Sequence, residues 1–124
     1  MSKVKTGKKV PDFTLPATGD QDISLSDFKG KNVVVYFYPK DSTSGCTTEG
    51  QNFRDKIATF RRRKTVILGV SRDSIRSHEN FKEKQAFPFE LLSDADEKLC
   101  KLFDVIKEKN MYGRKVMGIE RSTF

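Results

Sequence analysis

The sequence contains little sulfur and almost no histidine. It has two cysteines, Cys46 and Cys100, no Cys-x-x-Cys pair, and a single histidine, His78. Two cysteines are too few for a disulfide scaffold. Zinc and iron–sulfur sites need more cysteine and histidine ligands than the chain offers. We therefore expect no metal and no cofactor. His78 lies in a polar stretch, and we expect it at the surface without a role.

Long apolar segments are also missing. No stretch approaches the roughly 20 apolar residues that a membrane-spanning helix needs, and residues 1–9 lack the hydrophobic core of a secretory signal. These absences predict a cytoplasmic protein with no membrane partner. The chain has 124 residues, of which 35% are hydrophobic. That length is enough for one core, so we expect residues 1–124 to form a single domain.

Positive charge is in excess. There are 24 lysines and arginines against 17 acidic residues, which gives a formal net charge of +7. The densest run, residues 61–64, falls at the end of an expected helix, where cations complement the helix dipole. The other lysines are scattered and have no aromatic residues between them, so the charge does not favour nucleic-acid binding.

Two apolar runs set the fold class. Residues 33–38 and 65–71 are apolar on both faces, which is typical of strands covered on both sides. A helix over about residues 46–63 would join them in a right-handed parallel crossover. The pattern predicts an α/β fold with a central, mostly parallel sheet flanked by helices.

The rest of the chain alternates in the same way. We expect a short edge strand around Phe13 and Leu15, and a turn of helix over residues 23–29 capped by Ser24. Asp73 would cap a helix over residues 74–85, and a strand follows over 89–92. The acids of 94–97 open another helix, whose apolar stripe is Leu99, Leu102, Phe103 and Ile106. A closing strand is expected over residues 116–124.

Cys46 has the setting of a nucleophile. It lies at the start of a helix, directly after a buried strand. There, the N–H groups of the first turn and the helix dipole favour the thiolate over the thiol. A cysteine at such a position, taken alone, is more often a small buried hydrophobic residue.

The surrounding residues resemble a known family. Pro39-x-x-x-Thr43-x-x-Cys46, with Glu49 three residues on, resembles the peroxidatic motif of the peroxiredoxins. Five further segments resemble the bacterioferritin-comigratory (PrxQ) branch, in the family's order: residues 11–16, 25–31, 36–41, 91–94 and 117–124. The resemblance covers nearly the whole chain.

This resemblance implies a thioredoxin-like fold and the reduction of hydrogen peroxide and alkyl hydroperoxides by a thiol. Cys46 would attack the peroxide and become a sulfenic acid. Thr43 would hydrogen-bond the peroxide and the sulfur, and Arg121 would supply fixed donors to both. Pro39 would shield the sulfur, and Glu49 would hold the guanidinium. Taken singly, each of these residues also has an ordinary structural explanation.

The chain departs from the family at the resolving cysteine. Many members of the branch have it five positions after the first, where this chain has Gln51. Cys100 is either a small buried hydrophobic residue or the resolving cysteine. The second role requires a Cys46–Cys100 disulfide, and hence Cα atoms within about 7 Å or local unfolding that brings them together. We favour reduction by an external thiol such as thioredoxin, glutaredoxin or glutathione.

Two more departures concern the loop and the end of the chain. Ser44 replaces the usual proline, and we expect it to cap the helix in a looser loop. Phe124 lies inside an expected central strand, whereas the family continues with the rest of that strand and a final helix. We expect a truncated C-terminal strand and helix, exposed apolar area, and low stability or self-association.

Two other functions stay open. One is a thioredoxin-type thiol–disulfide oxidoreductase, against which the missing Cys-x-x-Cys argues. The other is a basic interaction module with a degenerate peroxidase site.

Overall fold

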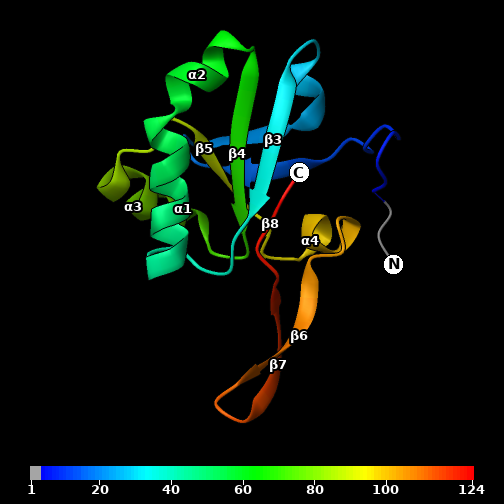
Figure 1. Cartoon of the computed structure of the whole chain (residues 1–124), viewed down its shortest axis with the longest axis vertical. Helices are drawn as coiled ribbons and strands as arrows, with labels where there is room; N and C mark the ends of the chain where they lie inside the picture. Colours follow the sequence, from blue (N-terminus) through cyan, green and yellow to red (C-terminus); the bar gives the residue numbers. More distant parts are fainter. Residues whose placement is uncertain (1–3) are drawn as a thin grey trace.

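A computed structural model describes residues 4–124, which are built around a six-stranded mixed sheet (Figure 1). The strand order is β2-β1-β5-β4-β3-β8, and the three central strands are parallel. The outer strands are antiparallel to their neighbours. The strands are β1 (Thr14–Ala17), β2 (Gln21–Ser24), β3 (Asn32–Phe37), β4 (Thr65–Ser71), β5 (Glu90–Ser93) and β8 (Ser122–Thr123). The predicted α/β class is confirmed, although β2 was not anticipated.

The two buried runs are β3 and β4, as predicted. They pair in parallel from Asn32↔Thr65 to Phe37↔Val70. Side chains alternate across the sheet, so Val35 and Phe37 enter one core cluster and Tyr36 enters the other. The sheet therefore separates two cores, one on each face.

Helices cover both faces (Figure 1). The core that contains Tyr36 is covered by α1 (Ser44–Asp55), α2 (Ile57–Arg62) and α3 (Ile75–Gln85). The other core includes residues of α4 (Lys98–Leu102) and is bordered by the short 3-10 helix η1 (Leu25–Phe28). In residues 4–124, no helix combines the length and apolarity that crossing a bilayer requires.

Two predicted helices differ in detail from the structure. The helix expected over residues 46–63 is interrupted at Lys56, whose N–H bonds to the carbonyl of Phe53 at 3.2 Å. The cap of α3 is Ser74, whose hydroxyl accepts from the Ser77 N–H, and not Asp73. Ser24 does precede η1, as expected.

From residue 94 onward, the predicted helix is present as α4, which buries Leu99, but the elements after it differ from the prediction. The acids of 94–97 precede α4, and the Asp94 carboxylate accepts from the N–H groups of Leu99 and Cys100. Ile106, expected on a helix, begins β6 (Ile106–Met111). β6 pairs with β7 (Arg114–Ile119) in a hairpin that projects from the body (Figure 1).

The closing strand is therefore shorter than expected. Of residues 116–124, β8 joins the central sheet through the pairs Tyr36↔Thr123 and Phe37↔Ser122. Phe124 continues along β3 with two backbone hydrogen bonds to Val35. Between β7 and β8, the Glu120 N–H bonds to the carbonyl of Val105. This break in the strand leaves Arg121 outside the ladder, with its side chain available for other contacts.

Candidate active site

Cys46 is the third residue of α1 and is buried against the sheet. The residue is 2% exposed, and its side chain belongs to the core cluster that contains Tyr36, Tyr38 and Phe87. The N–H groups of a first helical turn have no partners inside the helix. The sulfur therefore lies at the positive end of α1, shielded on the core side.

Arg121 links this sulfur to a carboxylate. Its Nη2 donates to Sγ of Cys46 at 3.3 Å, and its Nη1 donates to Oε1 of Glu49 at 2.7 Å. Burial alone would lower the pKa of Arg121, but the hydrogen bonds to Cys46 and Glu49 outweigh it and raise the pKa. The guanidinium therefore stays charged and bridges two groups of α1.

Glu49 lies one turn after Cys46, on the same face of α1. Its side chain is 18% exposed. Burial raises the pKa of Glu49, while the hydrogen bond and charge of Arg121 act in the opposite direction. Its position orients the guanidinium toward the sulfur.

The loop before α1 carries the other two predicted residues. Thr43 is the N-cap residue, but its hydroxyl accepts no hydrogen bond from the N–H groups of the helix. The hydroxyl donates instead to the Lys40 carbonyl at 2.7 Å. Ser44 is the first residue of α1 and not its cap. Pro39 is half-buried at the start of this loop. The structure thus brings Arg121 into direct contact with both Cys46 and Glu49, and places Thr43 and Pro39 on the adjoining loop.

Cys100 lies in the other core. It is fully buried on the opposite face of the sheet from Cys46, and both residues are free thiols. Burial raises the pKa of the Cys100 thiol well above its usual value, and the Asp94 carboxylate adds to this shift. A protonated, enclosed thiol is a poor nucleophile.

The expectation that His78 is a surface residue is wrong. Its side chain is fully buried, with Nδ1 at 2.7 Å from Oδ2 of Asp41 and Nε2 at 2.9 Å from the Leu92 carbonyl. The sequence held one signal for this, because His78 precedes the buried Phe81 by three positions on α3 and so shares its face. Its partners Asp41 and Leu92 lie far away in the sequence and gave no signal of burial.

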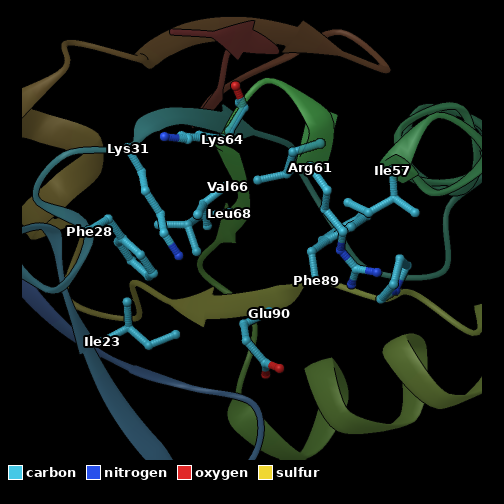
Figure 2. A pocket seen from close by; sticks show the side chains of 13 residues that line it. Ile23, Phe28, Lys31, Ile57, Arg61, Lys64, Val66, Leu68, Phe89 and Glu90 are labelled. Atoms are coloured by element: carbon cyan, nitrogen blue, oxygen red, sulfur yellow. The ribbon is translucent and has the colours of Figure 1, made fainter. Parts of the chain in front are cut away.

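A hollow of about 360 Å³ lies away from these residues (Figure 2). It is formed where β3, β4 and β5 begin, whereas Cys46 follows the end of β3. Lys31, Arg61 and Val66 are among the residues that line it, and none of the predicted site residues is. The chemistry is therefore associated with the Cys46 end of the sheet.

The comparison with known proteins agrees with this geometry. Residues 6–124 match the model of the AhpC/TSA family. The chain belongs to the AhpC/TSA family. Among its relatives, Peroxiredoxin Bcp of Xanthomonas campestris is 57% identical over 113 residues, which cover 91% of this chain and 71% of the relative. Peroxiredoxin Bcp of Bacillus subtilis is 50% identical over 121 residues, covering 98% and 77%.

Solved structures of peroxiredoxins give the same result. A mutant of Xanthomonas campestris Peroxiredoxin Q superposes with a TM-score of 0.86 at 56% identity, over 90% of this chain and 71% of that one. The predicted peroxiredoxin family, its Bcp/PrxQ branch and the thioredoxin-like fold are confirmed. So is the class of activity, a thiol-dependent peroxidase, which uses a peroxide substrate and a thiol reductant.

Proposed function

We propose that this peroxiredoxin reduces hydrogen peroxide and alkyl hydroperoxides through a sulfenic acid on Cys46. The observation that carries the proposal is the contact of Arg121 Nη2 with Sγ, at 3.3 Å, while Nη1 is held by Glu49. Trapped intermediate and ligand complex structures of the Xanthomonas campestris bacterioferritin comigratory protein address the alkyl peroxide reduction activity of that relative, which supports the substrate class.

The reaction needs a thiolate and a means to stabilise the leaving oxygen. The Cys46 thiolate attacks the terminal oxygen of the peroxide, the O–O bond breaks, and the sulfur becomes a sulfenic acid. The second oxygen leaves as hydroxide or alkoxide and takes up a proton to give water or an alcohol. Arg121, a fixed cation beside the sulfur, stabilises the negative charge that moves onto the leaving oxygen.

Thr43 and Pro39 have supporting roles in this proposal. Because the Thr43 hydroxyl donates its proton to the Lys40 carbonyl, its remaining lone pairs are oriented to accept from the peroxide O–H. Pro39 has no N–H that could hold water and is half-buried beside the loop. We assign it to limiting solvent access to the sulfur.

We further propose that an external thiol completes the cycle. Gln51 lies five positions after Cys46 on α1 and cannot form a disulfide, and Cys100 is buried in the opposite core. Thioredoxin, glutaredoxin and glutathione are the candidate reductants. The three are compared by supplying each in turn and following peroxide consumption over many turnovers.

Self-association is proposed from the exposed apolar side chains. Tyr112 is 100% exposed, Met117 57% and Phe124 49%, all on or after the projecting hairpin. Exposed apolar side chains such as these are available for contacts between copies. A sedimentation coefficient that rises with concentration is the expected result. We also propose a cytoplasmic location, which cell fractionation tests.

The decisive experiment compares the reduced protein with Cys46→Ser. Stopped-flow mixing with hydrogen peroxide, and separately with an alkyl hydroperoxide, gives the rate of thiol loss at Cys46. We expect a fast second-order reaction in the wild type and none in the variant. Equal peroxide consumption by both proteins would overturn the assignment of Cys46.

A further inference from the structure

A buried polar network lies beneath the loop that leads to Cys46. At its centre, the side chains of His78 and Asp41 are 0% and 3% exposed. Buried charged or polar groups of this kind are stable only when they are paired and hydrogen-bonded. The network uses residues of the loop, of α3 and of β5, so it connects the Cys46 loop to the body of the protein.

Both ring nitrogens of His78 face acceptors. Nε2 lies 2.9 Å from the carbonyl oxygen of Leu92, which can only accept, so Nε2 carries a proton. Nδ1 lies 2.7 Å from Oδ2 of Asp41. A neutral imidazole has one donor and one acceptor nitrogen. The Asp41 contact is therefore satisfied only if the shared proton resides on Nδ1 or on the carboxyl group.

The neighbours of Asp41 decide between these two states. Its Oδ1 accepts from the Tyr38 hydroxyl at 2.6 Å, and its Oδ2 accepts from the Ser77 hydroxyl at 2.8 Å. Hydrogen bonds to a carboxylate favour the ionised form. Burial and the charge of Asp41 raise the pKa of Tyr38, which keeps that hydroxyl a donor. The geometry thus describes an Asp41 carboxylate paired with a doubly protonated His78.

Asp41 is also the anchor of the loop itself. Its N–H donates to Oδ2 of Asp73 at 2.8 Å. The next residue, Ser42, has a left-handed backbone with φ of 63°, which a serine keeps only when its surroundings hold it. Thr43 follows directly, and Cys46 is the third residue of the helix that it caps. A shift of Asp41 would therefore move the groups around the sulfur.

We propose that His78 is a positioning residue for the peroxide reaction: its imidazolium holds the Asp41 carboxylate, and through it the loop that places Thr43 beside Cys46. The activity side of this proposal rests on the proposed function. The protonation of His78 does not, and it is measured separately.

A bound metal is the alternative use of this cluster. Ligand atoms of Asp41, Asp73 and His78 lie within 4.8 Å of one another. However, Oδ2 of Asp41 already accepts from Ser77, and Oδ2 of Asp73 accepts from the Ser71 hydroxyl and from the Asp41 N–H. These contacts favour a proton, and not a metal ion, between the imidazole and the carboxylate.

The first test reads the protonation state. Nitrogen NMR of the reduced wild-type protein at neutral pH, with ¹⁵N-labelled histidine, reports the single imidazole directly. We expect two protonated ring nitrogens, with the Nδ1 proton slow to exchange because it is buried. A bare Nδ1, or a spectrum that changes when zinc is added, would overturn the ion pair.

The second test reads the position of the loop. In His78→Gln, Asp41 stays charged but loses its cationic partner, and a displaced loop should slow oxidation of Cys46 by peroxide about tenfold or more. Alkylation of Cys46 by iodoacetamide does not depend on the placement of Thr43, so its rate should be unchanged or higher. In the double variant with Asp41→Asn, the buried charge is removed and part of the peroxide rate should return.

Controls separate positioning from general damage. Glu79→Gln changes the next residue of α3, which is exposed, and should leave both rates unchanged. If His78→Gln does not fold, Ser77→Ala removes one donor to the same carboxylate oxygen and should lower the peroxide rate about two- to threefold. Equal losses in the peroxide and iodoacetamide rates, or no loss in either, would contradict the positioning role.

The outcomes also separate the two proposals. If wild-type Cys46 does not react with peroxide, the proposed function fails. The positioning role is then judged by the amide NMR shifts of residues 42–46, which His78→Gln must move and Glu79→Gln must not.

Discussion

Gly45 and Arg121 are in close contact: a β-carbon on Gly45 would lie 3.1 Å from Nη2 of Arg121. The same nitrogen donates to Sγ of Cys46. Glycine at this position therefore leaves the space in which the guanidinium reaches the sulfur. A contact of 3.1 Å can be relieved only if the arginine moves by a few tenths of an ångström.

Gly45→Ala should slow the reaction of Cys46 with peroxide about tenfold, because the donor moves away from the reacting atoms. Helix propensity favours alanine over glycine, so stability should not fall. Stopped-flow oxidation and thermal unfolding measure the two effects. Ser44→Ala, at the preceding exposed position, is the matched control and should keep the wild-type rate. An unchanged rate in Gly45→Ala would mean that the contact has no role in the reaction.

Glu49→Gln tests the other end of the guanidinium. The amide can still accept from Arg121 but has no charge, so we expect the peroxide rate at neutral pH to fall about tenfold. Stability should change little, because the variant also removes a partly buried carboxylate whose ionised form is disfavoured. A loss of stability without a loss of rate would contradict this role.

The same residue predicts a pH dependence. Since burial raises the pKa of Glu49, the folded protein holds this proton at pH values where the unfolded chain has lost it. The contribution of Glu49 to stability therefore falls as pH rises from about 4.5 through the raised pKa. Unfolding measured across this range should show Glu49→Gln gaining stability relative to the wild type as the pH rises. The opposite trend would contradict the raised pKa.

Cys100 should not resolve oxidised Cys46 in the folded protein. The two thiols lie in different cores, on opposite faces of the sheet. After one equivalent of peroxide, mass spectrometry without reductant should show the addition of one oxygen, and Cys100→Ala should react as fast as the wild type. A loss of two hydrogens would instead show a Cys46–Cys100 disulfide. Oxidation in denaturant, where both thiols are accessible, is the positive control for that product.

Two neighbouring tyrosines should respond in opposite ways to the loss of their hydroxyl groups. Within residues 4–124, the buried Tyr36 hydroxyl has no hydrogen-bond partner, whereas that of Tyr38 donates to Asp41. Tyr36→Phe should be neutral or stabilise the fold by about 1 kcal/mol, and Tyr38→Phe should destabilise it by about 1–3 kcal/mol. Chemical denaturation measures both. Equal effects would mean that the two hydroxyls are equally satisfied.

The sequence was sufficient where structure depends on local pattern. Runs that are apolar on both faces predicted β3 and β4, and the motif around them placed Cys46 at the start of α1. The contact of Arg121 with Cys46 joins residues 75 positions apart, and it was anticipated only through the family resemblance. Local physics alone would have assigned Arg121 to the solvent.

Prediction failed where one pattern fits two structures. The stripe that ends at Ile106 suits a helix, yet Ile106 starts a strand. The only sequence signal for the hairpin was its turn at Tyr112 and Gly113. In the structure both residues have positive φ, at 53° and 79°, as a tight hairpin turn requires. His78 was missed for another reason. Its helix has a polar sequence, and its partner Asp41 lies 37 positions away.

A last prediction concerns the support beneath Cys46. Gly50, one turn after Cys46, packs so closely on Phe87 that a β-carbon there would lie 2.3 Å from Cζ of the ring. The ring cannot easily move, because Phe81 and Phe89 each lie with ring centroids 5.0 Å from it. Alanine favours the helix by about 1 kcal/mol, but overpacking of this kind costs about 1–3 kcal/mol.

Gly50→Ala should therefore lower the free energy of unfolding, against the trend of helix propensity. Because α1 must shift away from the ring, the peroxide rate of Cys46 should fall as well. Phe87→Leu leaves room for the added methyl group, so the double variant should be more stable than the sum of the two single changes predicts. Additive effects in this cycle would show that the contact between Gly50 and Phe87 does not set the position of α1.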